Sequence, residues 1–97
     1  MFEIFWTGTA RDQYARLKAD SSLAKRYKAV KKTFQFIASN PRHPGLRTHE
    51  FSSLKGPNGE KIFESYAEQK TPAAYRVFWF YGPNKDQITI IAVTPHP

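Results

Sequence analysis

The segment Tyr75–Tyr81, YRVFWFY, places the strongest constraint on how this 97-residue chain folds. Six of its seven residues are aromatic or aliphatic, and the seventh is Arg76. A guanidinium stays charged, and burying one without a partner costs several kcal/mol. The strand predicted here therefore needs a carboxylate beside Arg76 or a sheet face that is not entirely core.

Alternation along predicted strands shows which residues share a face with Arg76. Side chains in a strand point to opposite faces in turn. One face of the segment carries Arg76, Phe78 and Phe80, and the other carries Tyr75, Val77, Trp79 and Tyr81. Glu64 and Tyr66 share a face in the preceding strand. If the two strands are neighbours, Arg76 either lines a half-solvated concave surface with these residues or pairs with Glu64, and the two roles are compatible.

The order of the predicted elements indicates an α+β fold in one domain, residues 1–97. Alternation predicts strands at 2–7, 62–68, 74–81 and 88–94, with a short extended piece at 46–51. Apolar spacing predicts helices at 9–19, with Thr9 as N-cap, and at 21–40, capped by Ser21 or Ser22 and ended by Asn40-Pro41. Two helices cover one face of a four- or five-stranded, mainly antiparallel sheet and leave the other partly open. The last strand is apolar on both faces, which favours a central position.

Composition narrows the class of protein. The absence of cysteine excludes disulfides and thiolate metal sites, and the three histidines lack the spacing of a metal site. Neither a phosphate-binding glycine loop nor a serine nucleophile motif is present. No apolar run approaches the roughly 18 residues of a membrane span, and the first residues lack the pattern of a signal peptide. We therefore expect a cytoplasmic protein without cofactor or membrane contact.

Positive charge is concentrated in the second predicted helix. The chain has a net charge of +7, which favours polyanionic partners such as RNA or an acidic protein. Five of the cations fall within eight residues: Lys25, Arg26, Lys28, Lys31 and Lys32. These residues form either a solvated helix face or a surface for a polyanion.

In element order and basic charge the chain resembles the RelE/ParE superfamily of toxin–antitoxin toxins. The resemblance rests on LKG at Leu54–Gly56, the strand IFESYA, the strand AYRVFWFY and the terminal ITIIAVTPHP. It implies a β-α-α-β-β-β fold, an acidic antitoxin partner and, in the RelE-like branch, cleavage of mRNA in the ribosomal A site. Tyr75-Arg76 and, more loosely, Leu54–Gly56 carry the motif-specific part.

The resemblance also suggests site residues. The phosphate-contacting arginine of the family falls on Arg76, and the basic or histidine residue after its last strand falls near His96. The basic pair of the family falls near Glu64 and Tyr66, so the chain departs from the family there. Lys55 and Lys61 lie just upstream of that position.

Metal-free RNA cleavage needs a base for the 2′-hydroxyl, an acid for the leaving 5′-oxygen and a cation for the phosphorane-like transition state. We expect Glu64 to be the base, His96 the acid and Arg76 the cation, because the guanidinium fork matches two phosphate oxygens. The other predicted substrate contacts are stacking by Tyr66 or Tyr81 and polar contacts from Lys55, Lys61, Arg47 and His49.

Three functions stay open from the sequence. The first is an endoribonuclease toxin that acts on mRNA with or without the ribosome. The second is a ParE-like inhibitor that binds DNA gyrase and cleaves nothing, which the missing basic pair favours. The third is a non-toxic RNA- or protein-binding domain that shares the fold.

Overall fold

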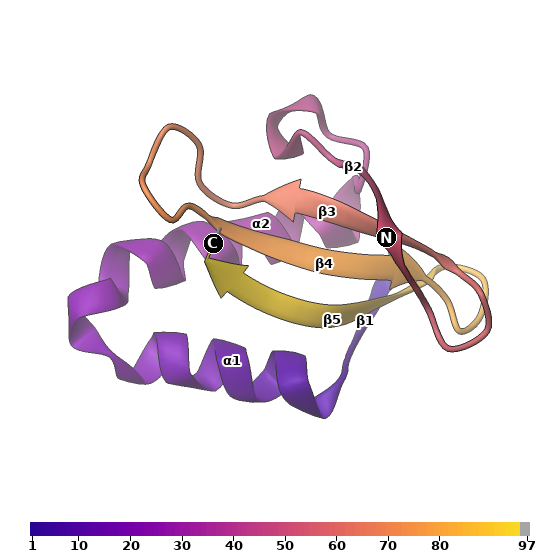
Figure 1. The fold of residues 1–97 in the computed structure, drawn as a ribbon, viewed down its shortest axis with the longest axis horizontal. Helices are drawn as coiled ribbons and strands as arrows, with labels where there is room; N and C mark the ends of the chain where they lie inside the picture. The colour runs from indigo at the N-terminus through magenta and orange to yellow at the C-terminus, as the bar shows by residue number, and fades with distance from the viewer. Residues whose placement is uncertain (96–97) are drawn as a thin grey trace.

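The computed structural model describes residues 1–95 and consists of five strands and two α-helices (Figure 1). The elements are β1 Glu3–Trp6, α1 Gly8–Ala19, α2 Ala24–Ser39, β2 His49–Lys55, β3 Lys61–Tyr66, β4 Tyr75–Tyr81 and β5 Gln87–Pro95. Short 3₁₀ turns occupy Ser21–Leu23 and Pro44–Leu46. These bounds agree with the predicted elements within a few residues, apart from the segment that contains β2.

The strands form a single sheet in the order β1-β5-β4-β3-β2. β1 runs parallel to β5, and every other neighbouring pair is antiparallel. β5 has a neighbour on each side, as its apolar residues on both faces predicted. The predicted α+β arrangement is therefore confirmed. The predicted first strand, β1, forms one edge of the sheet and runs parallel to its neighbour.

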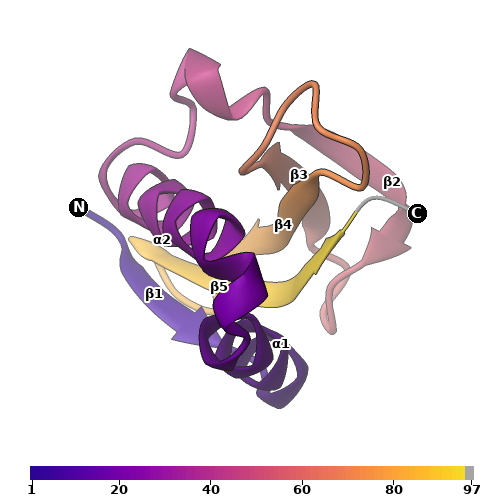
Figure 2. The ribbon, with the colours of Figure 1, turned by 90° about the vertical axis from the view of Figure 1, so that its left-hand side faces the viewer.

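Both helices pack on the same face of the sheet (Figure 2). The main core lies between them and the central strands. It includes Leu17, Val30, Phe34 and Ile37 from the helices and Val77, Trp79, Ile88, Ile90 and Val93 from β4 and β5. Burial of this apolar surface is the main driving force for folding.

The helix starts differ from the prediction. Thr7, not Thr9, caps α1, because its Oγ1 accepts a hydrogen bond from the Ala10 amide at 3.1 Å. The second helical segment starts with a 3₁₀ turn, capped by Asp20, whose Oδ1 accepts from the Ser22 amide at 3.0 Å. Neither Ser21 nor Ser22 is therefore the cap. α2 proper begins at Ala24 and ends before Asn40-Pro41, as predicted.

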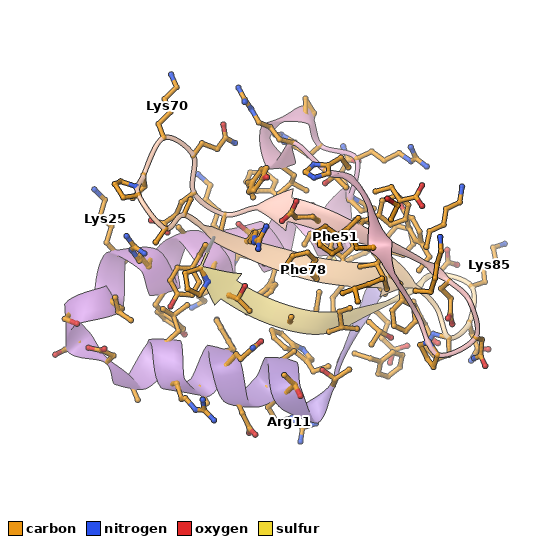
Figure 3. All side chains as sticks on the ribbon, viewed as in Figure 1. Arg11, Lys25, Phe51, Lys70, Phe78 and Lys85 are labelled. Carbon is orange, nitrogen blue, oxygen red and sulfur yellow. The ribbon has the colours of Figure 1, made fainter. Side chains whose placement is uncertain are left out.

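The face without helices carries a second, smaller core. Ile62, Phe78 and Phe80 are buried there, and Phe51 of β2 packs over Phe78 with ring centroids 5.0 Å apart (Figure 3). β2 crosses in front of β3 and β4 (Figure 1) and so shields this part of the sheet. The face is therefore only partly open, as predicted, and Tyr66 and Arg76 lie half-buried at one end of it.

Within residues 1–95, no helix has the length and apolar character needed to cross a membrane.

Candidate functional site

Three neighbouring strands bring four polar residues together on the helix-free face. The register pairs His49 of β2 with Glu64 of β3, and Tyr66 of β3 with Arg76 of β4. Because side chains alternate along each strand, Glu64, Tyr66 and Arg76 point to the same face, as predicted. We call these four residues the Glu64 cluster.

The carboxylate of Glu64 is the centre of the cluster. Arg76 Nη1 donates a hydrogen bond to Oε2, and His49 Nε2 lies 2.7 Å from Oε1. The Tyr66 hydroxyl makes a longer contact with Oε1, at 3.4 Å. The Glu64 side chain is only 3% exposed, so a buried carboxylate is held between the guanidinium of Arg76 and the imidazole of His49. The ion pair with Glu64 explains why an arginine is tolerated in the apolar strand β4.

Arg76 combines this ion pair with partial solvent access. Its guanidinium carbon lies 5.0 Å from the centre of the Phe78 ring, a cation–π arrangement, and 13% of its side chain is exposed. Its Nε is buried and has no hydrogen-bond partner among the described residues. The ion pair and the ring contact therefore fix the position of the guanidinium, and its Nε–H remains an unpaired donor within residues 1–95.

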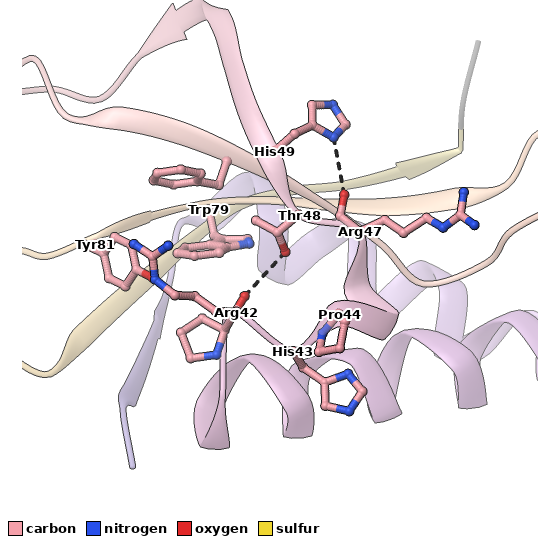
Figure 4. Close-up of a pocket in the computed structure, with 10 residues that line it drawn as sticks. Arg42, His43, Pro44, Arg47, Thr48, His49, Trp79 and Tyr81 are labelled. Carbon is pink, nitrogen blue, oxygen red and sulfur yellow. Dashed lines mark hydrogen bonds between the residues drawn. The ribbon is translucent and has the colours of Figure 1, made fainter.

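His49 is the accessible member of the cluster, with 51% of its side chain exposed. Arg47, two residues earlier, has the left-handed φ of 49° and directs its carbonyl toward the ring, 3.3 Å from Nδ1 (Figure 4). A carbonyl and a carboxylate are both acceptors, so each ring nitrogen of His49 faces an acceptor.

The environment keeps the Tyr66 hydroxyl neutral. Burial raises its pKa above the ordinary value of 10.0, the negative charge of Glu64 and its hydrogen bond raise it further, and Arg76 offsets part of the effect. A phenol in this state donates a hydrogen bond and does not accept a proton. Its ring lies 5.8 Å from that of His49, so Tyr66 also forms part of the wall beside the imidazole.

Other residues that the sequence proposed lie apart from the cluster. Lys55, at the far end of β2, pairs with Glu50 at 3.5 Å. Lys61 is three residues from Glu64 along β3, which places it on the alternate face, and within residues 1–95 it makes no ion pair with Glu64. Tyr81 also lies on the opposite face from Arg76 and stacks edge-on with Trp79 at 4.9 Å. His96 lies outside the described residues.

A pocket of about 310 Å³ opens beside the α2–β2 connection (Figure 4). Trp79 and Tyr81 contribute to its aromatic wall, and Pro41, Arg42 and Thr48 lie around them. Beneath it, the Trp79 indole donates to Ser65 Oγ at 2.8 Å, and Ser65 Oγ lies 2.6 Å from Thr48 Oγ1. This hydroxyl pair could not be predicted from the sequence, because Thr48 and Ser65 are 17 residues apart along the chain.

Residues 1–95 contain no group of three or more histidine, cysteine, aspartate or glutamate side chains placed to hold a metal ion. The Glu64 cluster supplies one carboxylate and one imidazole, and the guanidinium of Arg76 occupies the second carboxylate oxygen. The chemistry that this arrangement suits is binding of an anion or transfer of a proton from the imidazole.

The fold of the chain is similar to those of several solved toxin structures. It aligns with the YoeB/ParE toxin from Agrobacterium tumefaciens with a TM-score of 0.72 and 14% identity, covering 99% of this chain and 100% of the other. The YoeB dimer from Staphylococcus aureus gives a TM-score of 0.63 and 14% identity, covering 99% and 98%. The RelE–RelB complex from the archaeon Pyrococcus horikoshii gives 0.63 and 12%, covering 97% and 93%.

The fold is therefore that of the RelE/ParE toxins, and the resemblance predicted from the sequence is confirmed at the level of fold. No protein-family model matches the chain. No curated protein matches its sequence either.

Proposed function

We propose that this chain is the toxin of a type II toxin–antitoxin system and that it is an endoribonuclease acting on mRNA. The observation that supports this best is the Glu64 cluster on the helix-free face of a RelE/ParE-type fold. It unites a fixed guanidinium, an exposed imidazole and a neutral tyrosine within one small area. These are groups that bind phosphate, donate a proton and stack on a base.

In the proposed reaction Arg76 stabilises the charge that develops on the phosphorane-like transition state. His49, doubly protonated and oriented by Glu64, donates its Nδ1 proton to the departing 5′-oxygen when that oxygen replaces the Arg47 carbonyl. His96, the acid suggested by the sequence, is kept as the alternative donor. Tyr66 contributes a hydrogen bond or a stacking surface.

Glu64 is kept as the acceptor of the 2′-hydroxyl proton, as the sequence suggested, with one added condition. Its two oxygens are occupied by Arg76, His49 and Tyr66, and the side chain is almost fully buried. A ribose hydroxyl therefore has to displace one of these partners before the proton moves. In the resting arrangement Glu64 holds the two cationic groups in position.

The proposed partners are an acidic antitoxin and the ribosome with its mRNA, in the cytoplasm. The structure from P. horikoshii is that of a RelE–RelB complex, so a chain with this fold has been crystallised with an antitoxin-type partner. The net charge of +7 supports an acidic partner for the present chain.

A ParE-like gyrase inhibitor is the second candidate, and one observation favours it. Among residues 1–95, no pair of lysines or arginines lies beside Arg76 on the helix-free face, and the carboxylate of Glu64 neutralises part of the charge there. A non-toxic binding domain of the same fold is the third. Neither alternative requires an accessible proton donor beside Arg76.

Controlled expression in growing cells separates the three functions. An endoribonuclease arrests growth and leaves mRNAs with new internal ends, a gyrase inhibitor causes filamentation with DNA damage, and a non-toxic domain has no effect. We expect mRNA cleavage that is lost in Arg76→Lys and His49→Gln but retained in Lys85→Gln, an exposed position in the β4–β5 loop, beyond the end of β4 that is away from Arg76. Growth arrest with intact mRNAs would reject the nuclease assignment.

A further inference from the structure

Most of the net positive charge of the chain lies in the segment that forms the two helices, and little of it lies in the sheet and loops that carry the Glu64 cluster. Residues 8–39, which contain both α-helices, carry eight lysines and arginines and only two acidic residues. That segment accounts for six of the seven net positive charges. The sheet and its loops are therefore close to neutral, although they carry the candidate site.

Four lysines of α2 form one continuous outward face, which we call the α2 lysine stripe: Lys25, Lys28, Lys31 and Lys32. At about 100° per residue they fall within an arc of about 120°. The buried residues Val30, Phe34 and Ile37 lie on the opposite side of the helix. All four lysines are exposed, and none forms an ion pair within residues 1–95.

Arg26 belongs to a different environment, although it lies within the same basic run. It donates hydrogen bonds to the carbonyls of Pro72 and Ala73 at 3.0 Å, and its Nε lies 3.7 Å from Glu68. Its guanidinium also lies 5.6 Å from the centre of the Tyr75 ring. Arg26 thus fastens the β3–β4 loop to α2, and the predicted five-residue polyanion surface is reduced to four lysines.

The closely spaced lysines of the α2 lysine stripe repel one another and so lower the stability of α2. Lys28 and Lys32 are four residues apart, which places like charges side by side at a cost of about 0.2–0.5 kcal/mol. Lys25 lies in the first turn, near the positive end of the helix dipole, and that turn contains no acidic residue. Within the described fold, no compensating contact to an acidic group offsets this arrangement.

We propose that the α2 lysine stripe is a docking surface for the phosphate backbone of double-stranded RNA, separate from the Glu64 cluster. It lies on the helical side of the sheet, whereas the cluster lies on the helix-free side (Figures 1 and 2). The inference extends the proposed function, since it identifies structured RNA as a second ligand that positions the protein. Contacts with phosphate hold a protein in place without reading sequence.

The composition of the surface favours RNA over an acidic protein. Protein interfaces are centred on buried aromatic or aliphatic anchors and are depleted in lysine. Gln35, which lies between the lysines on the same face, is polar, and no large apolar side chain of α2 is exposed. From Lys25 to Lys32 the stripe extends about 10 Å along the helix, enough to follow about three phosphates of one strand.

Fluorescence anisotropy with a labelled RNA duplex of roughly 20 base pairs tests the proposal directly. The test variant is Lys28→Gln/Lys32→Gln, and the matched control is Lys70→Gln/Lys85→Gln, which removes the same charge from exposed loops. Glutamine preserves helix propensity, so the test variant retains its fold. Thermal unfolding of both variants verifies this before the binding measurement.

We expect the parent and the control to bind the duplex with an affinity that falls steeply between about 50 and 200 mM salt. The test variant should lose about one unit of the slope of log affinity against log salt for each lysine removed. Equal binding by test and control variants, or an affinity independent of salt, would overturn the proposal. So would stripe-dependent binding of polyglutamate without binding of the duplex.

The outcome is independent of cleavage, because mRNA is the proposed substrate of the Glu64 cluster and the duplex is bound at a separate surface. An Arg76→Lys variant that binds the duplex like the parent but leaves mRNA intact supports both proposals. A parent that binds the duplex but never cleaves mRNA supports the docking surface and rejects the nuclease function.

Discussion

His49 Nε2 lies 2.7 Å from Glu64 Oε1, while the second oxygen of the same carboxylate accepts a hydrogen bond from Arg76. A single buried carboxylate thereby links β2, β3 and β4. Because the Glu64 side chain is 3% exposed and that of His49 is 51% exposed, the two residues have different consequences for stability. Glu64 supports the fold and the site, whereas His49 contributes mainly to the site.

The first prediction concerns the substitution Glu64→Gln. It removes the charge that balances Arg76, and loss of one member of a buried ion pair costs about 3–5 kcal/mol of unfolding free energy. His49→Gln, by contrast, replaces a half-exposed partner of Glu64 with an amide that can still donate to Oε1, and it should cost about 1 kcal/mol or less. Urea unfolding of the two variants beside the parent measures the difference. Similar small losses for both would show that Glu64 does not have the structural role described here.

The second prediction concerns the substitution Ser65→Ala. Ser65 is fully buried, and its Oγ accepts the indole N–H of Trp79 at 2.8 Å. Without that oxygen, a buried donor stays unsatisfied, which costs about 1–3 kcal/mol. Ser52→Ala on the exposed part of β2 is the matched control and should change stability by less than about 0.5 kcal/mol. Equal unfolding midpoints for the two variants would contradict the hydroxyl network.

Alternation explains why much of the candidate site was predictable from the sequence. Arg76 and Glu64 each lie in an unambiguous strand, so their faces followed from the period of two residues. The two strands are neighbours along the chain, and neighbouring strands usually pair. The ion pair between them, one of the two predicted roles of Arg76, is present for that reason.

The remaining part of the site depended on register and local backbone conformation. β2 pairs with β3 through an irregularity between Glu50 and Lys55, so no alternation rule places His49 opposite Glu64. The left-handed backbone of Arg47 places its carbonyl beside the His49 imidazole. Arginine seldom adopts this conformation, so the sequence does not predict it. The sequence therefore favours His96 as the acid, whereas in the structure His49 is the histidine that contacts the carboxylate of Glu64. Likewise, the predicted cap Thr9 is wrong because only the folded geometry shows which threonine accepts the Ala10 amide, and that residue is Thr7.

The third prediction is that Lys28→Gln/Lys32→Gln stabilises the protein at low salt. The substitution removes a like-charge pair at helical spacing and should raise the unfolding free energy by about 0.2–0.5 kcal/mol. The gain should disappear near 1 M salt, where the Debye length falls to about 3 Å. Thermal unfolding at both salt concentrations checks this, with Lys70→Gln/Lys85→Gln as the control. A variant less stable than the parent at low salt would show that these lysines support the helix.

The fourth prediction uses the raised pKa of Tyr66. The folded protein holds the phenol in its neutral form more strongly than the unfolded chain does, because burial and the charge of Glu64 disfavour the phenolate. The resulting stability is present in full below the unfolded pKa of about 10 and is lost as pH rises through the higher folded value. Tyr66→Phe has no such group, so its unfolding free energy should fall less steeply on the alkaline side.

Urea unfolding of the parent and of Tyr66→Phe between about pH 8 and about pH 11 measures this effect. The difference in unfolding free energy, parent minus variant, should be constant up to about pH 9 and then decrease. Both proteins share every other titrating group, so the decrease reports Tyr66 alone. A difference that stays constant over the whole range would mean that the hydroxyl ionises equally in the folded and unfolded states. Tyr66 would then be more open to solvent than its contact with Glu64 indicates.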